Sequence, residues 1–543
     1  MICHLFGQIL KTVNFHPPLF LKGTDMKNRI ISLVLAMLTC LLAVSFASCG
    51  KDPVSGNETN NDVEVVETKD IQNETEYVSE SLDPVITEDP MITAEAYDND
   101  VTSGQYNYDG YEFTFLNSSD IWSMYVYIDP DMTGDVLDDS CFERNTLAEQ
   151  YFNITIKEET ETFAELANTA KTLILADEDA YDVMYIPARN LTPLISENLF
   201  YDLLEVEQLN IDRVWWDQPL IERNTIEGRL FYATSDLNLM AFEGVWCMYF
   251  NEDMIKSLGL ALPYELALSG NWTFDELKKY CAAAANLNGD SSFTFSTEGD
   301  SVYGLANSNT MGYFAYGMGA EYCSRDENGR YYFSADTDPV FNSVWENIIG
   351  FFGPEDGMTV NTTGSDLADD GYFGVFEARR ALFLHAELKG ATMLREWDGN
   401  FGLLPQPKYS ADQETYNSNI LQNCLSFCIP NTNTNLERTG TIVDYLTYAS
   451  YTDLLPKYYN IHVSLKALGK QESIDVLALI RGTRGVEVAV PYEWCGSLEG
   501  ALKELAMKNE YSLASTLEKS KASIESAINK TYETYPTLRN VEE

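Results

Sequence analysis

The sequence contains little histidine, and it lacks the short motifs of common hydrolases, metalloproteases and nucleotide-binding proteins. Four histidines occur in 543 residues, and His385 and His462 are the two that lie beyond residue 48. Two histidines so far apart suggest neither a histidine metal site nor a Ser–His–Asp triad. The patterns GxSxG, HExxH and GxxxxGK[ST] do not occur. We therefore expect no catalytic residue, no metal and no cofactor.

Basic residues are also scarce. Lys and Arg number 35 against 84 Asp and Glu, which gives a formal net charge of -49. Nucleic acids and anionic lipid surfaces both require a basic protein surface. The charge therefore excludes nucleic acid as a partner, and it argues against a protein that binds anionic lipid through its own surface.

Cysteines are few and scattered, with no CxxC pair that would suggest a metal or redox site. A scattered, odd set in a large chain is not the framework of a small disulfide-rich protein. Cys247 lies inside an apolar run and is expected to be a core residue. The cysteines that follow Cys49 are Cys141, Cys247, Cys281, Cys323, Cys424, Cys428 and Cys495.

The N-terminal segment has the pattern of an export signal. Lys27 and Arg29 precede an apolar run over 30–44, and small residues lead to Cys49. Residues 1–25 do not fit this pattern, so we expect the chain to begin at Met26. The segment that follows Cys49 is rich in Asp, Glu, Asn, Ser and Thr without apolar periodicity, which predicts a disordered acidic tether.

From residue 108 onward, strand-like and helix-like segments alternate. Strands are predicted over 111–116, 153–156 and 181–186, with helices over 142–151 and from Thr162, where Glu165 has the capping-box spacing. This order indicates a parallel or mixed α/β sheet, whose ligands are expected at the carboxyl ends of strands. Later predictions are a helix that begins after Asp338 with Trp345 in the core, strands over 380–384 and 425–430, a helix from Asn435 and a C-terminal helix over 513–528.

The stretch 228–277 carries the most distinctive order of features. Two strand-like runs, 229–233 and 244–250, flank a polar break at 235–238. The second run ends in Tyr-Phe-Asn at Asn251, and Trp-Thr-Phe-Asp-Glu-Leu at 272–277 starts a helix that Thr273 can cap. Together with Phe-Gly-Leu-Leu-Pro-Gln-Pro-Lys at 401–408, this order resembles the extracellular solute-binding proteins of ABC importers. It is most similar to the family-1 branch that includes maltose-binding protein, and the resemblance covers residues 108–535.

The resemblance implies an α/β, two-lobed periplasmic-binding-protein-like fold with a hinge between the lobes. The chain is expected to cross between lobes near Thr234–Asn238, Leu404–Lys408 and Arg438–Asp444. The expected organisation is a signal peptide over 1–48, an acylated cysteine and tether over 49–107, an N-terminal lobe over 108–235 and 405–440, and a C-terminal lobe over 236–404 and 441–543. The residues before Cys49 resemble a bacterial lipobox, with Phe46 where leucine is usual. Cys49 is then the lipidation site, and cleavage without lipidation is the alternative.

The ligand is expected between the lobes. Aromatic residues, including 33 Tyr and 8 Trp, suit a sugar, because sugars stack on flat rings while polar groups bind their hydroxyls. An ordinary turn, a surface charge or a packing role is the alternative for each candidate. The residues that the resemblance places at the ligand are Asn117, Asp120, Arg189, Glu243, Asn307, Asn309, Tyr313, His385, Glu387, Tyr492 and Trp494.

These features predict a lipid-anchored, monomeric solute-binding protein on the outer face of the cell membrane. It would deliver a carbohydrate, with an oligosaccharide as the first expectation, to ABC permease subunits. Two alternatives stay open: a surface carbohydrate-active enzyme that uses paired carboxylates, and an adhesin on the same fold. Residues 286–290 resemble a truncated calcium loop, for which a plain Asn/Gly turn is the alternative.

Overall fold

The computed structural model describes residues 97, 101–119, 126–127, 135–353, 356–362, 371–464 and 470–538. The chain divides into two units, Met1–Val85 and Ile86–Glu543, and every described residue belongs to the second. The predicted signal peptide, Cys49 and most of the predicted tether lie outside the described residues.

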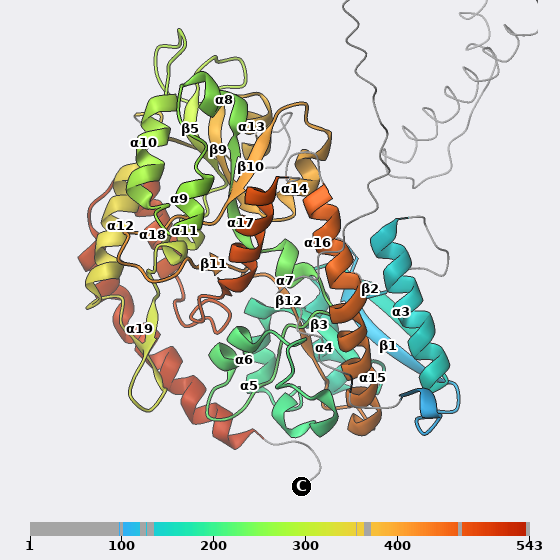
Figure 1. The fold of residues 1–543 in the computed structure, drawn as a ribbon. Helices are drawn as coiled ribbons and strands as arrows, with labels where there is room; N and C mark the ends of the chain where they lie inside the picture. The colour runs from blue at the N-terminus through green and yellow to red at the C-terminus, as the bar shows by residue number, and fades with distance from the viewer. Residues whose placement is uncertain are drawn as a thin grey trace, which may run out of the picture. The chain divides into compact units, whose positions relative to one another are not determined.

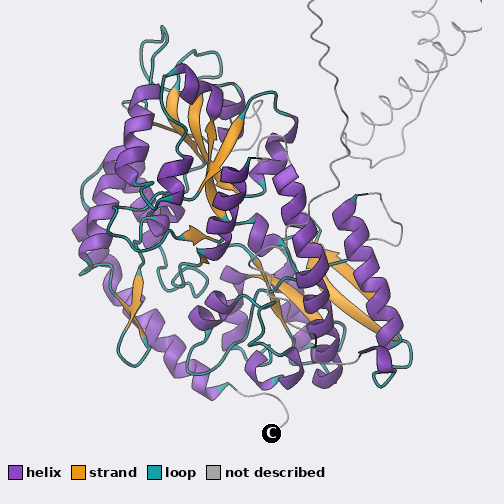
Figure 2. Ribbon diagram, viewed as in Figure 1, coloured by secondary structure: helices purple, strands orange, loops and turns teal. Residues whose placement is uncertain are grey.

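The second unit contains two main sheets formed by different parts of the chain (Figure 2). In the first sheet, β1 (Tyr111–Ser118) pairs in parallel with β2 (Ile154–Glu161) and β3 (Val183–Pro187). The fourth strand, β12 (Leu425–Cys428), comes from much later in the chain and pairs antiparallel to β3. We call the part of the molecule built on this sheet the first lobe.

The second sheet has the order β10-β4-β9-β5-β8. β5 (Tyr303–Asn307) pairs in parallel with β8 (Thr359–Asn361) and β9 (Ala381–Glu387). β4 (Trp246–Asn251) pairs antiparallel to both β9 and β10 (Phe401–Leu404). Every residue of β4 is buried, which explains its continuous apolar sequence. We call the part built on this sheet the second lobe.

Helices cover both sheets, as Figure 1 shows. In the first lobe, α15 packs on α3, and α5 on α4. In the second lobe, α10 covers β5 and β9, while α17 packs on β10 and α9. The first-lobe helices are α3 (Val136–Phe152), α4 (Leu166–Leu175), α5 (Leu191–Ser196) and α15 (Leu436–Ala449). The second-lobe helices are α8 (Glu252–Ser257), α9 (Tyr264–Leu268), α10 (Phe274–Ala284), α11 (Met311–Gly317), α12 (Pro339–Phe351), α13 (Tyr372–Glu377), α14 (Gly390–Met393), α17 (Gln471–Gly482), α18 (Leu498–Lys508) and α19 (Leu513–Thr534).

Smaller elements lie between and beside these layers. α6 (Gln218–Asn224) and α7 (Met240–Glu243) flank the first passage from lobe to lobe, and β11 (Ser418–Asn419) pairs with β13 (Arg484–Gly485). β6 (Cys323–Arg325) and β7 (Tyr331–Phe333) form a separate antiparallel hairpin. The short helices are η1 (Val101–Ser103), η2 (Ala188–Asn190), η3 (Leu203–Glu205), η4 (Glu207–Leu209), η6 (Leu394–Glu396) and η8 (Tyr535–Thr537).

The last passage between the sheets is helical. α15 is followed by one π-helical turn, η7 (Ser450–Leu454), and then by α16 (Leu455–Ser464). Residues 438–444, where we expected the third crossing, lie inside α15, which packs on α3 and η4 in the first lobe. The lobe boundaries given above remain predictions.

Two local predictions were wrong. The helix expected from Thr162 begins at Leu166, and the Glu165 side chain makes no capping hydrogen bond. The run 229–233 forms no regular strand, since it makes only isolated bridges, from Ile226 to Arg229 and from Ala233 to Phe427. The path of the run 229–233 is therefore determined more by its hydrogen bonds to the first lobe than by its strand propensity.

Two further features concern the cysteines and the helices of the described residues. All seven cysteines among the described residues are buried and none forms a disulfide. No helix in the described ranges combines the length and the apolar character needed to cross a bilayer.

Candidate functional site

Four of the predicted residues meet around Trp246, at the start of β4. The ring of Tyr313, from α11, stacks on the Trp246 indole with centroids 4.7 Å apart and planes 18° apart. The His385 ring, from β9, lies 4.7 Å from the indole centroid, and Glu387 is paired with Trp246 across the two strands. Asn307, at the end of β5, lies 3.0 Å from His385 Nδ1. The ends of β5 and β9 thus bring these residues together at one edge of the sheet, as parallel strands do.

His385 is a buried, neutral link in this cluster. Burial lowers the pKa of His385 to about 3. The Gln406 amide donates to His385 Nε2 (2.8 Å) and also to the Tyr313 carbonyl (3.0 Å). Since Nε2 accepts, the imidazole proton lies on Nδ1 and is donated to Asn307 Oδ1. His385 therefore holds β5, β9 and the segment after β10 together.

Two carboxyl groups lie near Lys389 beside this cluster. Glu243 Oε2 is 3.6 Å from Lys389 Nζ, and Glu243 is 4% exposed. Burial raises the pKa of Glu243 to about 7, and Lys389 lowers it only in part. Burial likewise raises the pKa of Glu387 to about 7, again with Lys389 opposing. Glu243, which was predicted to contact the ligand, is thus buried beside Lys389 in this conformation, and its ligand role stays a prediction.

A chain of contacts links this cluster to the first lobe. Arg189, in η2 after β3, donates from Nη2 to Gln422 Oε1 at 2.9 Å. Gln422 donates its backbone N–H to the Tyr313 hydroxyl at 3.0 Å. Arg189 also lies 3.5 Å from Glu499 Oε2, at the start of α18. Arg189 and Tyr313, which are far apart in sequence, are therefore joined through Gln422, a residue that the sequence patterns did not single out.

A small cavity lies beside Gln422, with a volume of about 20 Å³. This is room for about one water molecule. Its wall includes Asn224 and Thr234, and Asn224 Oδ1 and Thr234 Oγ1 have no hydrogen-bond partner among the described residues. The remaining lining residues are Ala188, Leu220, Tyr232, Ile420, Leu421, Gln422, Cys424, Ser426, Val486 and Pro491. Buried polar atoms of this kind normally bind water or a ligand.

A second set of contacts holds the end of α6. The Arg325 guanidinium donates to the Glu222 carbonyl (2.5 Å) and to the Arg223 carbonyl (3.3 Å). The Tyr331 hydroxyl also donates to the Arg223 carbonyl (3.1 Å). The Tyr492 hydroxyl donates to the Asn224 carbonyl at 2.6 Å. We call Arg325, Tyr331 and Tyr492 the clasp, because they bind the last carbonyls of α6, which an isolated helix leaves unpaired.

The helix held by the clasp extends from the first lobe. Its N-cap Asp217 donates its backbone N–H to the Thr234 carbonyl, and Trp216 packs on Phe427 of β12. Arg223 adds an ion pair with Glu321 at 2.9 Å, just before the hairpin β6–β7. The clasp residues belong to the hairpin and to the loop before α18. These contacts therefore tie the two lobes together at α6.

The predicted aromatic residues of that loop are packed. The Trp494 ring stacks on the Tyr492 ring, with centroids 4.9 Å apart. The ring of Tyr331 also packs against Trp494, with a centroid distance of 5.4 Å. The indole Nε1 donates to Thr531 Oγ1 at 2.9 Å, and the side chain is 1% exposed. In this conformation no ring face of Trp494 is open to a sugar, so its ligand role stays a prediction.

The other predicted residues lie apart from Trp246 or outside the described ranges. Asn117, at the end of β1, donates from Nδ2 to Glu158 Oε1 on β2 at 2.7 Å. Asn309 has a left-handed backbone (φ 57°), and its Oδ1 has no partner within the described part of the chain. Asp120 lies outside the described residues.

The possible calcium loop has the geometry of a closed polar turn. Asp290 Oδ2 accepts from Ser301 Oγ (2.6 Å), from Ser301 N (2.7 Å) and from Asp300 N (2.9 Å). Asn286 Oδ1 accepts from the backbone of Asn288, as in an Asx turn. Among the described residues no group of three or more His, Cys, Asp or Glu side chains could hold a metal ion.

Comparison with known proteins agrees with the two-lobed architecture. No protein-family model and no curated protein sequence matches the chain. A solved structure of a cyclic alpha-maltosyl-1,6-maltose binding protein from Arthrobacter globiformis is similar, with 10% sequence identity and a TM-score of 0.53. The match covers 78% of this chain and 100% of that one.

Two further structures give a similar picture. An ABC substrate-binding protein from Listeria monocytogenes in complex with cycloalternan has 11% identity and a TM-score of 0.50, and the match covers 78% of this chain and 100% of that one. An ABC transporter solute binding protein from Thermotoga lettingae, bound with alpha-D-tagatose, has 12% identity and a TM-score of 0.50, with 77% and 100% covered. The predicted fold class is confirmed: the chain has the two-lobed α/β fold of the solute-binding proteins of ABC transporters.

Proposed function

We propose that the chain is the solute-binding component of an ABC importer and that it captures a carbohydrate between its two lobes. Cys49 would carry the lipid anchor, residues 49–107 would act as a tether, and the folded part would work as a monomer outside the cell membrane. Permease subunits would receive the solute. The similar structures support the sugar class, since their ligands are cycloalternan and alpha-D-tagatose in two of the cases above.

One observation carries this proposal more than the others. The contacts Arg189–Gln422–Tyr313 join the end of a first-lobe strand to the aromatic cluster of the second lobe. A guanidinium, an amide and an aromatic ring thus meet where the lobes meet. These are the groups that bind sugar hydroxyls and the apolar faces of sugar rings.

Binding would involve a change in the distance between the lobes. The cavity beside Gln422 is far smaller than a sugar, so a sugar would enter after Arg189 and Gln422 separate. A ligand that contacts both lobes stabilises the closed arrangement by its difference in affinity for the two arrangements.

The proposal can be tested by thermal denaturation of the purified chain with mono- and oligosaccharides, polyols and amino acids. A ligand at 100 times its dissociation constant stabilises the folded state by about 2.7 kcal/mol. Arg189→Ala should weaken a sugar that binds between the lobes by about tenfold or more. Arg395→Ala removes the same charge from an exposed position in η6 and should leave the affinity unchanged.

Small-angle X-ray scattering adds a second measurement. A bound sugar should reduce the radius of gyration of the parent chain if the lobes close on it. A sugar that binds equally to both Arg variants and leaves the radius unchanged would contradict the interlobe site. Turnover of chromogenic glycosides would instead favour the alternative of a surface enzyme that uses paired carboxylates.

A further inference from the structure

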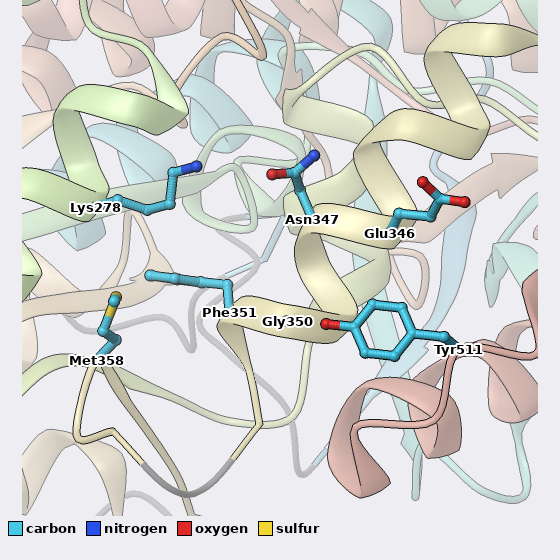
Figure 3. Close-up of a pocket in the computed structure, with 7 residues that line it drawn as sticks. All are labelled: Lys278, Glu346, Asn347, Gly350, Phe351, Met358 and Tyr511. Carbon is cyan, nitrogen blue, oxygen red and sulfur yellow. The ribbon is translucent and has the colours of Figure 1, made fainter.

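A groove on the second lobe, separate from the interlobe contacts, has a volume of about 270 Å³ (Figure 3). It lies between α10, α12, the start of β8 and the loop that precedes α19. Phe351 and Met358 form its apolar part, while Lys278, Glu346, Asn347 and Tyr511 contribute polar groups. The volume is close to the lower end of the range for small-molecule sites, about 300 Å³. None of these residues lines the cavity beside Gln422.

Several of the polar groups have capacity to bind a ligand. Within the described part of the chain, neither the Glu346 carboxylate nor the Tyr511 hydroxyl has a hydrogen-bond partner. The Asn347 amide donates from Nδ2 to the Ser343 carbonyl at 2.9 Å, which orients its oxygen as an acceptor. Tyr511 is 65% exposed, the largest value among the exposed apolar and aromatic side chains of the described residues. An exposed aromatic ring beside unpaired polar groups is a sugar-binding arrangement.

Gly350 determines how these groups are placed. Glu346 and Gly350 are four residues apart in α12 and share a helix face. A Cβ at position 350 would lie 2.9 Å from the Tyr511 hydroxyl. The missing side chain lets Tyr511 approach the helix backbone. It also leaves space over α12 between Lys278 and Met358 on one side and Tyr511 on the other (Figure 3).

The charges indicate the class of ligand. Lys278 and Glu346 carry opposite charges, and Lys278 is also ion-paired with Asp275 at 2.8 Å, so the lining offers no excess positive charge to an anion. The rest of the chain is strongly acidic and repels anions. A neutral, polyhydroxylated ring can bind the Glu346 carboxylate, the Asn347 amide oxygen and the Tyr511 phenol together. Its C–H faces can pack on Met358 and Tyr511.

We propose that this groove is a second carbohydrate site, which takes a short neutral saccharide on the outside of the second lobe. The site is independent of the proposed interlobe site, because it uses other residues. It would allow the chain to hold a polysaccharide or an oligosaccharide at its surface while the interlobe site is empty or filled.

The test is binding of maltotriose, cellotriose and xylotriose to the purified chain, measured by saturation-transfer NMR and calorimetry. Tyr511→Ala and Gly350→Ala should each weaken one binding event by about tenfold. Gly350→Ala is useful because alanine favours the helix and changes the site only by displacing Tyr511. Tyr332→Ala is the matched control, since Tyr332 is an exposed tyrosine of β7 that lies outside the groove.

The outcomes separate this site from the interlobe site. Loss of binding in Tyr511→Ala and Gly350→Ala, with binding retained in Arg189→Ala and Tyr332→Ala, supports the groove even if the interlobe proposal fails. Equal binding by the parent and both groove variants overturns it, and so does absence of any saccharide signal at millimolar concentration.

Discussion

The hydroxyl of Tyr313 accepts a hydrogen bond from the backbone of Gln422 while the ring of Tyr313 stacks on Trp246. One side chain therefore contacts both the loop that leads back to the first lobe and β4, an interior strand of the second-lobe sheet. Movement of the Gln422 loop must change the environment of the indole, whose Nε1 has no hydrogen-bond partner among the described residues. The fluorescence of Trp246 should for this reason report separation of the lobes.

The clasp should favour the closed arrangement. Arg325→Ala removes the guanidinium that binds two carbonyls of α6. We expect a larger radius of gyration in solution and a loss of roughly 1–2 kcal/mol in the free energy of unfolding. Scattering and urea denaturation measure the two effects.

Arg330→Ala is the matched control for the clasp. Arg330 precedes the second strand of the same hairpin, but it binds Asn529 and stacks on Tyr532, both in the second lobe. Its removal should leave the radius of gyration unchanged. If both variants expand the molecule equally, the effect comes from the hairpin or from charge, and the clasp has no role in closure.

Trp494→Ala should act on stability. The indole is buried against Tyr492 and Tyr331, so its truncation is expected to lower the free energy of unfolding by about 3–5 kcal/mol. Urea denaturation at constant pH measures this loss. A ligand-stacking tryptophan would behave differently: its variant would lose sugar affinity with stability nearly intact.

Stability should fall as the pH rises from about 4.5 to about 7. Burial raises the pKa of Glu243 from 4.5 to about 7. The unfolded chain therefore loses this proton first, and the folded state, which still binds it, becomes less favourable through that interval. One such proton changes the free energy of unfolding by up to about 1.4 kcal/mol per pH unit.

Glu243→Gln tests this pH dependence directly. Glutamine keeps the shape of the protonated acid, so the variant should show a flatter decline of the melting temperature between these pH values. Glu510→Gln, at an exposed position, provides the same charge change and should keep the parent slope. If the melting temperature of Glu243→Gln falls with pH as steeply as that of the parent chain, other acids cause the decline. Glu158 and Asp236 are examples, because burial also raises their pKa values to about 7.

Two glycines should respond to alanine in opposite directions. A Cβ on Gly304, in β5, would lie 2.3 Å from Cys281 Cβ and 2.6 Å from the Met358 carbonyl. Gly304→Ala should therefore destabilise the second lobe by about 1–3 kcal/mol or more. Gly500, inside α18, has no atom within 4 Å of the added Cβ. Gly500→Ala should raise stability by about 0.5–1 kcal/mol, as measured by chemical denaturation.

Local signals in the sequence predicted much of the fold correctly. Asp338 accepts from the backbone of Val340 at the start of α12, and Thr273 accepts from that of Glu276 at the start of α10. Both caps depend on residues within one turn of the helix. The prediction at Thr162 was wrong because the helix begins at Leu166, four residues after the expected start, and residues 163–165 form a separate turn. The prediction of a strand over 229–233 was wrong because this run makes only two isolated bridges, Ile226 with Arg229 and Ala233 with Phe427.

The candidate site was harder to predict, because it depends on residues far apart in the chain. Arg189, Tyr313 and His385 were singled out from the family resemblance, and the structure places them around one set of contacts. Gln422 lies in an irregular loop, so no periodic pattern distinguished it. Trp494 shows the opposite difficulty: its sequence position suggested an open ring, and only the packing of Tyr492 and Tyr331 shows that both faces are covered.

The natural cysteines allow separation of the lobes to be followed by alkylation, without an engineered cysteine. Cys424 lies in the wall of the cavity beside Gln422 and is 5% exposed. Burial raises the pKa of its thiol, so alkylation is slow while the cavity is closed. Cys281 lies in the core of the second lobe and serves as the reference. The rate of alkylation at Cys424 relative to Cys281 therefore measures how often the lobes separate beside Gln422.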